Sequence, residues 1–137
     1  MVRFTWASAS CCTQCPALGY MTMVVSASTK FQVPEWPAAF EETFNFPSVR
    51  LASQGLVIIK AGDMKPERFS QGALAEWDHS AWDRREVIHA GPDKVHIDTR
   101  FTRYRKDGSV IGGFDSIYVV NRENGKWGVK IRSSYAP

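Results

Sequence analysis

Two neighbouring side chains, Asp78 and His79, could supply a general base. A carboxylate or an imidazole in an apolar setting can have its pKa moved toward neutrality, as a general base requires. Trp77 precedes the pair and Trp82 follows it, which favours aromatic surroundings. Adjacent residues point in different directions, however, and Asp78-His79-Ser80 equally suits the end of a helix that runs into a turn. The pair is therefore a candidate base with a structural alternative.

Tyr118 is the second candidate, because a tyrosine hydroxyl in a cavity can polarise a carbonyl group or stabilise an enolate. It could equally be a core aromatic residue with a satisfied hydroxyl. Its surroundings follow from the dipeptides at 107–108 (Asp-Gly) and 124–125 (Asn-Gly), which suit two-residue hairpin turns. These turns predict three antiparallel strands between residues 94 and 135, in which Phe101 faces Phe114 and Tyr118 faces Ile131.

This register assigns each side chain to a face, because side chains alternate along a strand. The first face is mainly apolar and is expected to be buried. It also carries a row of three hydroxyl groups, on Thr99, Ser116 and Ser133. Buried hydroxyls need hydrogen-bond partners. They bond to one another or to water, or they mark the wall of a polar cavity.

We predict that a ligand pocket lies on this face. Arg103 could hold an anionic group at its mouth, or could simply lie in solvent at the end of a strand. No Asp or Glu of the three strands falls on the face, so a base would have to be Asp78, His79 or a helix residue such as Glu41. This weakens the case for isomerase-type catalysis. The predicted pocket residues are Trp77, Thr99, Phe101, Arg103, Phe114, Ser116, Ser133 and Tyr135.

The second face has an apolar centre with a charged rim. Such a strip suits a self-complementary interface about a two-fold axis. We therefore expect a homodimer through this face, although a fully solvated face is the alternative. The predicted interface residues are Arg100, Asp115, Ile117, Val119 and Arg132.

Composition excludes several classes of function. The chain has 137 residues, enough for one domain, and a net charge of +3 without a basic run, which argues against nucleic-acid binding. No apolar run approaches the length of a membrane span. Cys11, Cys12 and Cys15 have no second pair at metal-ligand spacing, so we expect no metal. The rest of the chain suggests no disulfide framework, so we expect a reducing cytoplasm. No motif indicates a cofactor.

The remaining pattern predicts helices over 16–30, 35–44 and 65–77, a hairpin or bent strand over 48–60 and a strand over 84–89. Residues 1–15 are expected to form an extension and residues 16–137 a single domain. We predict an α+β fold, a cone-shaped roll in which a curved, mixed or mostly antiparallel sheet packs against about three N-terminal helices.

The chain resembles a bacterial branch of the nuclear transport factor two-like, or SnoaL-like, superfamily of cystatin-like cone folds. The likeness covers roughly residues 36–137 and rests on residues 44–50 (FNFPSVR), 77–80 (WDHS), 91–96 (GPDKVH), 100–104 (RFTRY), 114–116 (FDS) and 132–136 (RSSYA). The resemblance implies an internal cavity and dimers through the outer sheet face. Superfamily members include isomerases, cyclases, dehydratases, epoxide hydrolases and binding modules.

We therefore expect a domain that binds a small apolar or carbonyl-containing molecule. A cofactor-independent enzyme of isomerase, cyclase, dehydratase or hydrolase type, with Asp78 or His79 as base and Tyr118 as helper, is the alternative. A protein-interaction subunit is a second one. Fold alone does not decide among them.

Overall fold

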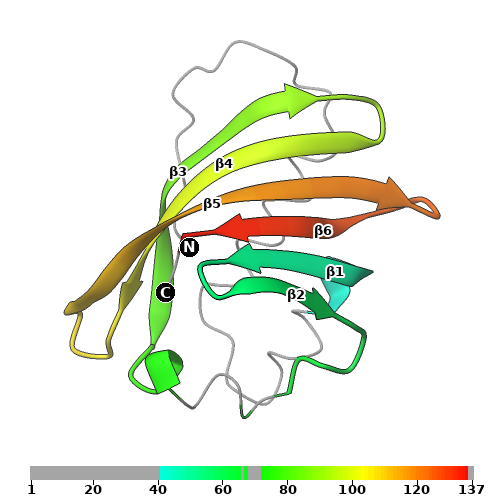
Figure 1. Ribbon diagram of the computed structural model, residues 1–137. Coiled ribbons are helices and arrows are strands. Elements are labelled where there is room, and N and C mark those ends of the chain that lie inside the picture. Colours follow the sequence, from blue (N-terminus) through cyan, green and yellow to red (C-terminus); the bar gives the residue numbers. More distant parts are fainter. Residues whose placement is uncertain (1–40, 66, 68–71, 136–137) are drawn as a thin grey trace.

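Six strands form one curved, mixed sheet in the computed structural model, which describes residues 41–65, 67 and 72–135 (Figure 1). The order across the sheet is β2-β1-β6-β5-β4-β3, and only the β1–β6 pair is parallel among the described strands. The elements are β1 (Phe44–Ala52), β2 (Gly55–Ile59), the short 3-10 helix η2 (Gly72–Leu74), β3 (His79–Ala90), β4 (Lys94–Tyr104), β5 (Val110–Glu123) and β6 (Lys126–Ser134).

The predicted three-strand meander is confirmed as β4, β5 and β6. Asn124 and Gly125 form the second turn with φ angles of 52° and 80°, so Glu123 pairs with Lys126 as expected for a two-residue hairpin. The first connection is longer than predicted, because the amide of Arg105 donates to the carbonyl of Ser109. An extra residue in β5 then restores the predicted register, and Phe101 faces Phe114.

A bulge in β6 overturns part of the predicted register. Val120 still pairs with Val129, but Val119 pairs with Ile131, so Lys130 is the extra residue. A bulge of one residue moves every later side chain to the opposite face. The hydroxyl of Ser48 in β1 donates to the Lys130 carbonyl at 3.1 Å.

The bulge corrects the faces assigned to the residues of β6 that follow it and to Tyr135. Ser133 and Tyr135, expected in the pocket, lie on the other face, and Tyr135 is 73% exposed. Arg132, expected in the dimer face, instead pairs with Tyr118 on the face predicted to be buried. The hydroxyl row consequently ends at Ser134, which is buried, while Ile131 is 40% exposed.

Strands also begin earlier than the local sequence indicates. Phe44 is the first residue of β1, although the sequence pattern places it in a helix over 35–44. Residues 41 and 42 of that predicted helix are helical, and residues 35–40 lie outside the described part. β3 begins at His79 rather than at residue 84, because it pairs along the whole of β4 as far as Tyr104. Tertiary pairing overrides the weaker local preference in both strands.

The other predicted helices are described only in part or not at all. Within 65–77 the only helical structure of the described residues is 3-10, at Glu67 and in η2. Residues 66 and 68–71, the helix predicted over 16–30 and the three cysteines lie outside the described residues. The bent strand predicted over 48–60 is confirmed as the β1–β2 hairpin, in which Gly55 has a φ of 115°.

Asn45 links β1 to β5 by side-chain hydrogen bonds. Its amide nitrogen donates to the backbone carbonyl of Asn121 at 3.0 Å and to its side-chain oxygen at 3.1 Å. Gly128 makes this contact possible, because a Cβ atom there would lie 2.6 Å from the Asn45 side chain.

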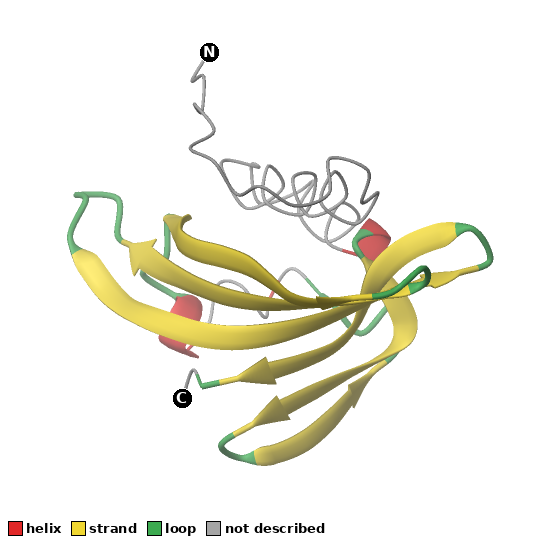
Figure 2. Ribbon diagram, turned by 90° about the horizontal axis from the view of Figure 1, so that it is seen from above, coloured by secondary structure: helices red, strands yellow, loops and turns green. Residues whose placement is uncertain are grey.

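The core lies on one face of the sheet, which we call the inner face. Its fully or nearly fully buried residues are Phe44, Val95, Ile97, Tyr118, Val120, Trp127 and Val129. The strands bend strongly around this face (Figure 2). We call the opposite side, which carries Asp98, Asp115 and Ile131, the outer face.

Candidate functional site

Four aromatic rings from three neighbouring strands form a patch on the inner face. Trp82 of β3 pairs with Phe101 of β4, which in turn pairs with Phe114 of β5. The ring centroids lie 5.7 Å apart for Trp82–Phe101 and 5.6 Å apart for Phe101–Phe114. Tyr118 lies 6.4 Å from Trp82 in an edge-on arrangement. Cross-strand pairing therefore builds a continuous aromatic wall.

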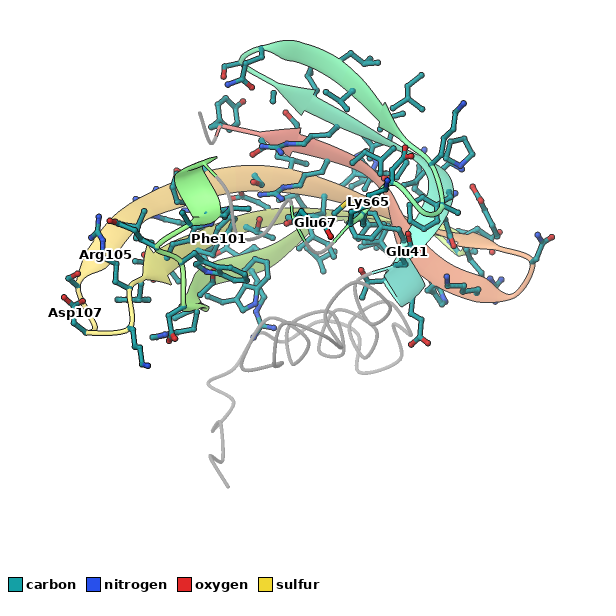
Figure 3. All side chains as sticks on the ribbon, turned by 90° about the horizontal axis from the view of Figure 1, so that it is seen from below. Glu41, Lys65, Glu67, Phe101, Arg105 and Asp107 are labelled. Atoms are coloured by element: carbon teal, nitrogen blue, oxygen red, sulfur yellow. The ribbon has the colours of Figure 1, made fainter. Side chains whose placement is uncertain are left out.

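Two arginines lie over this wall. The Arg103 guanidinium carbon lies 5.5 Å from the Phe101 ring centre and 4.8 Å from that of Phe114. The Arg132 guanidinium carbon lies 5.5 Å from Phe101 and 5.2 Å from Tyr118. Both cations thus share the Phe101 ring, which lies on the inner side of the curved sheet (Figure 3). Favourable cation–π contacts hold them there.

The surroundings of Arg103 disfavour its positive charge. Burial, followed by the positive charges of Arg132 and Arg50, lowers the pKa of Arg103 to about 10, against a smaller opposing effect of Tyr118. Arg50 belongs to the same cluster, since it is the β1 partner of Arg132. Among the described residues, no carboxylate acts on the charge of Arg103. The inner face therefore holds closely spaced like charges in a partly desolvated place.

Buried polar groups around the cluster are incompletely bonded. Thr99 donates from its hydroxyl to the Ser116 carbonyl at 2.9 Å, and Arg132 Nη2 donates to the Ser116 hydroxyl at 3.3 Å. Trp82 Nε1 and Arg132 Nε are fully buried, yet neither has a hydrogen-bond partner among the described residues. A buried donor without a partner is costly and marks a place where a ligand or water belongs.

The structure does not bring the predicted base and Tyr118 together. His79 pairs with Tyr104, on which its ring stacks at 5.0 Å, and this places it on the outer face. Its Nδ1 atom lies 2.8 Å from a carboxylate oxygen of Asp78, and both side chains are partly exposed. The neighbouring Ser80, opposite Arg103, points inward instead.

The other predicted pocket residues are placed as follows. Thr99, Phe101, Arg103, Phe114 and Ser116 share the inner face with Tyr118. Trp77, which precedes β3, donates from Nε1 to the Ser80 hydroxyl at 3.0 Å.

The outer face carries an ion-pair network in the predicted place. Arg84 Nε donates to Asp98 at 2.8 Å, and Arg84 Nη2 donates to Asp115 at 3.1 Å. Arg100 also pairs with Asp115, as the register predicts. Ile117 and Val119 lie beside this network, on the same face.

A separate shallow hollow of about 330 Å³ is lined by Phe46, Pro47, Lys60 and Ala61. It contains none of the arginines or aromatic residues of the inner-face site, and its lining offers no group of polar atoms that could orient a ligand. In the described part of the chain, no three potential metal-ligating side chains gather, and no helix is long and apolar enough to cross a bilayer.

Sequence reasoning missed two arginines of the site. Arg132 was assigned to the wrong face because strict alternation fails at Lys130. Arg50 lies in a strand whose parallel partner β6 is far along the chain. Only the bulge and that partner reveal the cluster, although Arg103 alone was recognised as a candidate for binding an anion.

Comparison with known proteins places this geometry in a family. A family model described as NTF2-like protein (DUF6841) matches residues 42–136. No sequence among curated proteins matches the chain.

Solved structures share the fold at low sequence identity. An NTF2-like protein from Cytophaga hutchinsonii superposes with a TM-score of 0.64 at 11% identity, covering 89% of this chain and 96% of that one. An NTF-2 like protein from Shewanella oneidensis gives 0.64 at 9% identity, over 88% and 96%. A cystatin-like protein from Nostoc punctiforme gives 0.62 at 14%, over 88% of each chain. The curved sheet is thus that of the cystatin-like NTF2 fold.

Proposed function

The chain belongs to the NTF2-like protein family DUF6841, and we propose that it binds a small organic molecule against the aromatic wall of its inner face. Ligand sites typically combine apolar and aromatic walls with a few convergent polar groups. The wall here consists of Trp82, Phe101, Phe114 and Tyr118, and its polar groups are the guanidinium groups and the Ser116 hydroxyl.

One observation carries this proposal. Trp82 Nε1 lies in the aromatic wall, is fully buried and has no hydrogen-bond partner among the described residues. Leaving such a donor unpaired costs about 1–3 kcal/mol. A ligand with an acceptor atom beside Trp82 recovers this free energy while its body packs on the rings.

Binding without chemistry is the simpler reading of the geometry. An enzyme that uses Asp78 or His79 together with Tyr118 needs the base on the inner face, but the pairing of His79 with Tyr104 directs its side chain outward. No contact among the described residues links that base to the aromatic wall.

Nuclear magnetic resonance can test the proposal through the indole N–H signal of Trp82. We would titrate the protein with neutral aromatic and carbonyl compounds such as indole, 2-naphthol and acetophenone. We expect at least one to shift the Trp82 signal saturably and to leave the Trp127 signal in place. Trp82→Phe identifies the signal. If every compound moves both signals weakly and without saturation, the proposed function is wrong.

We also propose that the outer face forms a homodimer interface. Ile131, which the bulge turns outward, is 40% exposed and joins Ile117 and Val119 in an apolar strip beside the ion-pair network. Light scattering after size-exclusion chromatography should give a dimer mass that Ile131→Asp reduces to that of a monomer. Val110→Asp, an equivalent change at an exposed residue near the β4–β5 hairpin, is the control. A monomeric wild-type protein would rule this interface out.

A further inference from the structure

We propose that the ligand of the inner face is a small organic anion, whose oxyanion group lies between the guanidinium groups of Arg103 and Arg132. This inference rests on the proposed function, because it names the chemical class of molecule that the same site takes. It changes the expected ligand from an apolar or carbonyl-containing molecule to an organic acid.

The pairing of arginines across the sheet is the first argument. Four other arginines, Arg84, Arg100, Arg105 and Arg122, each form an ion pair with a carboxylate. Within the described residues, the inner-face Arg103 makes no hydrogen bond or ion pair at all. These four ion pairs contrast with Arg103, whose charge meets no carboxylate among the described residues.

Arg132 repeats the pattern. Its Nη2 atom donates to the Ser116 hydroxyl at 3.3 Å, whereas its buried Nε has no partner within the described part of the chain. Arg85, on the inner side of β3, likewise pairs with no described carboxylate and lies 5.8 Å from the Trp82 ring centre. Arg103, Arg132 and Arg85 therefore each have N–H groups that make no hydrogen bond to a described carboxylate.

The geometry suits a carboxylate or phosphate group better than a neutral acceptor. The guanidinium carbons of Arg103 and Arg132 each lie 5.5 Å from the centre of the Phe101 ring, so both groups lie against the same ring. Guanidinium groups carry several N–H donors in a fixed plane and recognise oxyanions by paired, charge-assisted hydrogen bonds. The half-buried setting strengthens such bonds relative to water.

Charge neutralisation supplies the driving force. The positive charges of Arg132 and Arg50 act on Arg103 and contribute to its lowered pKa. An anion bound beside Arg103 and Arg132 offsets the repulsion between these two charges. The aromatic wall then contacts the organic part of the same molecule, so one ligand satisfies both halves of the site.

Acetate is the probe for this inference, because it is the smallest carboxylate and fits whatever room the site offers. Acetamide is its neutral counterpart. We would follow the Nε–H signals of Arg103 and Arg132 by NMR in the wild-type protein, with chloride replaced to hold ionic strength constant. Phosphate in the same titration would show which oxyanion binds more tightly.

We expect acetate to shift both signals saturably and acetamide to leave them unchanged. Arg103→Met and Arg132→Met should each raise the acetate Kd about tenfold or more, the equivalent of about 1.4 kcal/mol. Arg122→Met is the matched control, because it removes one positive charge from an arginine that also lies over a ring, that of Trp127, but is paired with Asp93. Its Kd should remain within about twofold of wild type. Retained amide spectra show that each variant is folded.

The outcomes separate this inference from the proposed function. Acetate that leaves both arginine signals unmoved, or a loss of affinity in Arg122→Met equal to that in Arg103→Met, overturns the anion site. If neutral compounds still shift the Trp82 signal in that case, ligand binding stands and only its anionic class is wrong. If no compound of either kind binds, both proposals fall.

Discussion

Replacing Arg103 by Met should make the ligand-free protein more stable while weakening anion binding. The substitution removes the charge but keeps an unbranched side chain that can cover Phe101 and Phe114. In wild type this charge has no carboxylate partner among the described residues and faces Arg132 and Arg50. Replacing a poorly compensated buried charge by an apolar group of similar size is often stabilising.

The expected magnitude follows from two opposing contributions. The full drop in the pKa of Arg103 to about 10 corresponds to about 3 kcal/mol, at about 1.4 kcal/mol per pKa unit. Because solvent still reaches part of this guanidinium, about half of that value, ~1.5 kcal/mol, is a realistic gain. Lost cation–π contacts with two rings offset about 0.5–1 kcal/mol. The variant should thus be about 0.5–1 kcal/mol more stable.

The gain should depend on pH in a defined direction. The pKa of Arg103 is lower in the folded protein than in the unfolded chain, so the charged side chain disfavours folding. This penalty is fully present below pH 10 and shrinks at higher pH, where the folded protein releases the proton first. The stability difference between Arg103→Met and wild type should therefore be constant up to about pH 9 and decline above pH 10.

Urea unfolding at fixed protein concentration, followed by circular dichroism, measures this difference. With a slope of about 2 kcal/mol/M, the midpoint should rise by about 0.4 M without a change in slope. Arg122→Met, which loses an exposed ion pair, should show no gain. A midpoint for Arg103→Met that falls by 0.5 M or so, or a difference unchanged up to about pH 11, would refute the account of Arg103 as an uncompensated charge.

Three further predictions concern other parts of the protein. Gly128→Ala should lower the free energy of unfolding by about 1–3 kcal/mol, because the new Cβ atom would meet Asn45. Gly113→Ala should change it by less than about 0.5 kcal/mol, since only the flexible end of an arginine is nearby, and urea unfolding compares the two variants. Acetate affinity should fall as pH rises through 10, as Arg103 loses its proton, and NMR titration at about pH 8 and pH 11 would show it; a constant affinity contradicts the role of this residue. Hydrogen bonds from Asn121 and Lys130 lower the pKa of Glu123, so its carboxylate stabilises the fold above the pKa of the unfolded chain and loses this effect as pH falls. The unfolding midpoint of Glu123→Gln should therefore lie below that of wild type near neutral pH and converge with it in acid. A gap between the two midpoints that stays constant with pH would exclude this contribution.

Short-range signals in the sequence predicted the meander well. Asn124-Gly125 adopts two positive φ angles with little strain, so the β5–β6 hairpin and its first pairs could be read directly. Alternation then placed Thr99, Phe101, Arg103 and Tyr118 on one face correctly. These inferences held because each depends on residues that are close in the chain.

The base candidates could not be placed in this way. Asp78-His79-Ser80 has no strong strand pattern, and its place at the start of β3 is set by pairing with Tyr104 and Arg103 more than twenty residues later in the chain. That pairing decides that Ser80 points inward and His79 outward. Local propensity carries no information about which end of a neighbouring strand a segment will reach.

The sequence by itself determined the turns, the alternation along β4 and β5, the presence of Arg103 beside an aromatic face and the likeness to the NTF2-like fold. Only the tertiary structure decided which other charges join Arg103. The bulge at Lys130 lies beside β1, where the hydroxyl of Ser48, 82 positions earlier, donates a hydrogen bond to the Lys130 carbonyl. Since one extra residue reverses the face of every side chain after it, the bulge turns Arg132 inward and Ser133 and Tyr135 outward. The arginine cluster is therefore a product of strand pairing that no local pattern encodes.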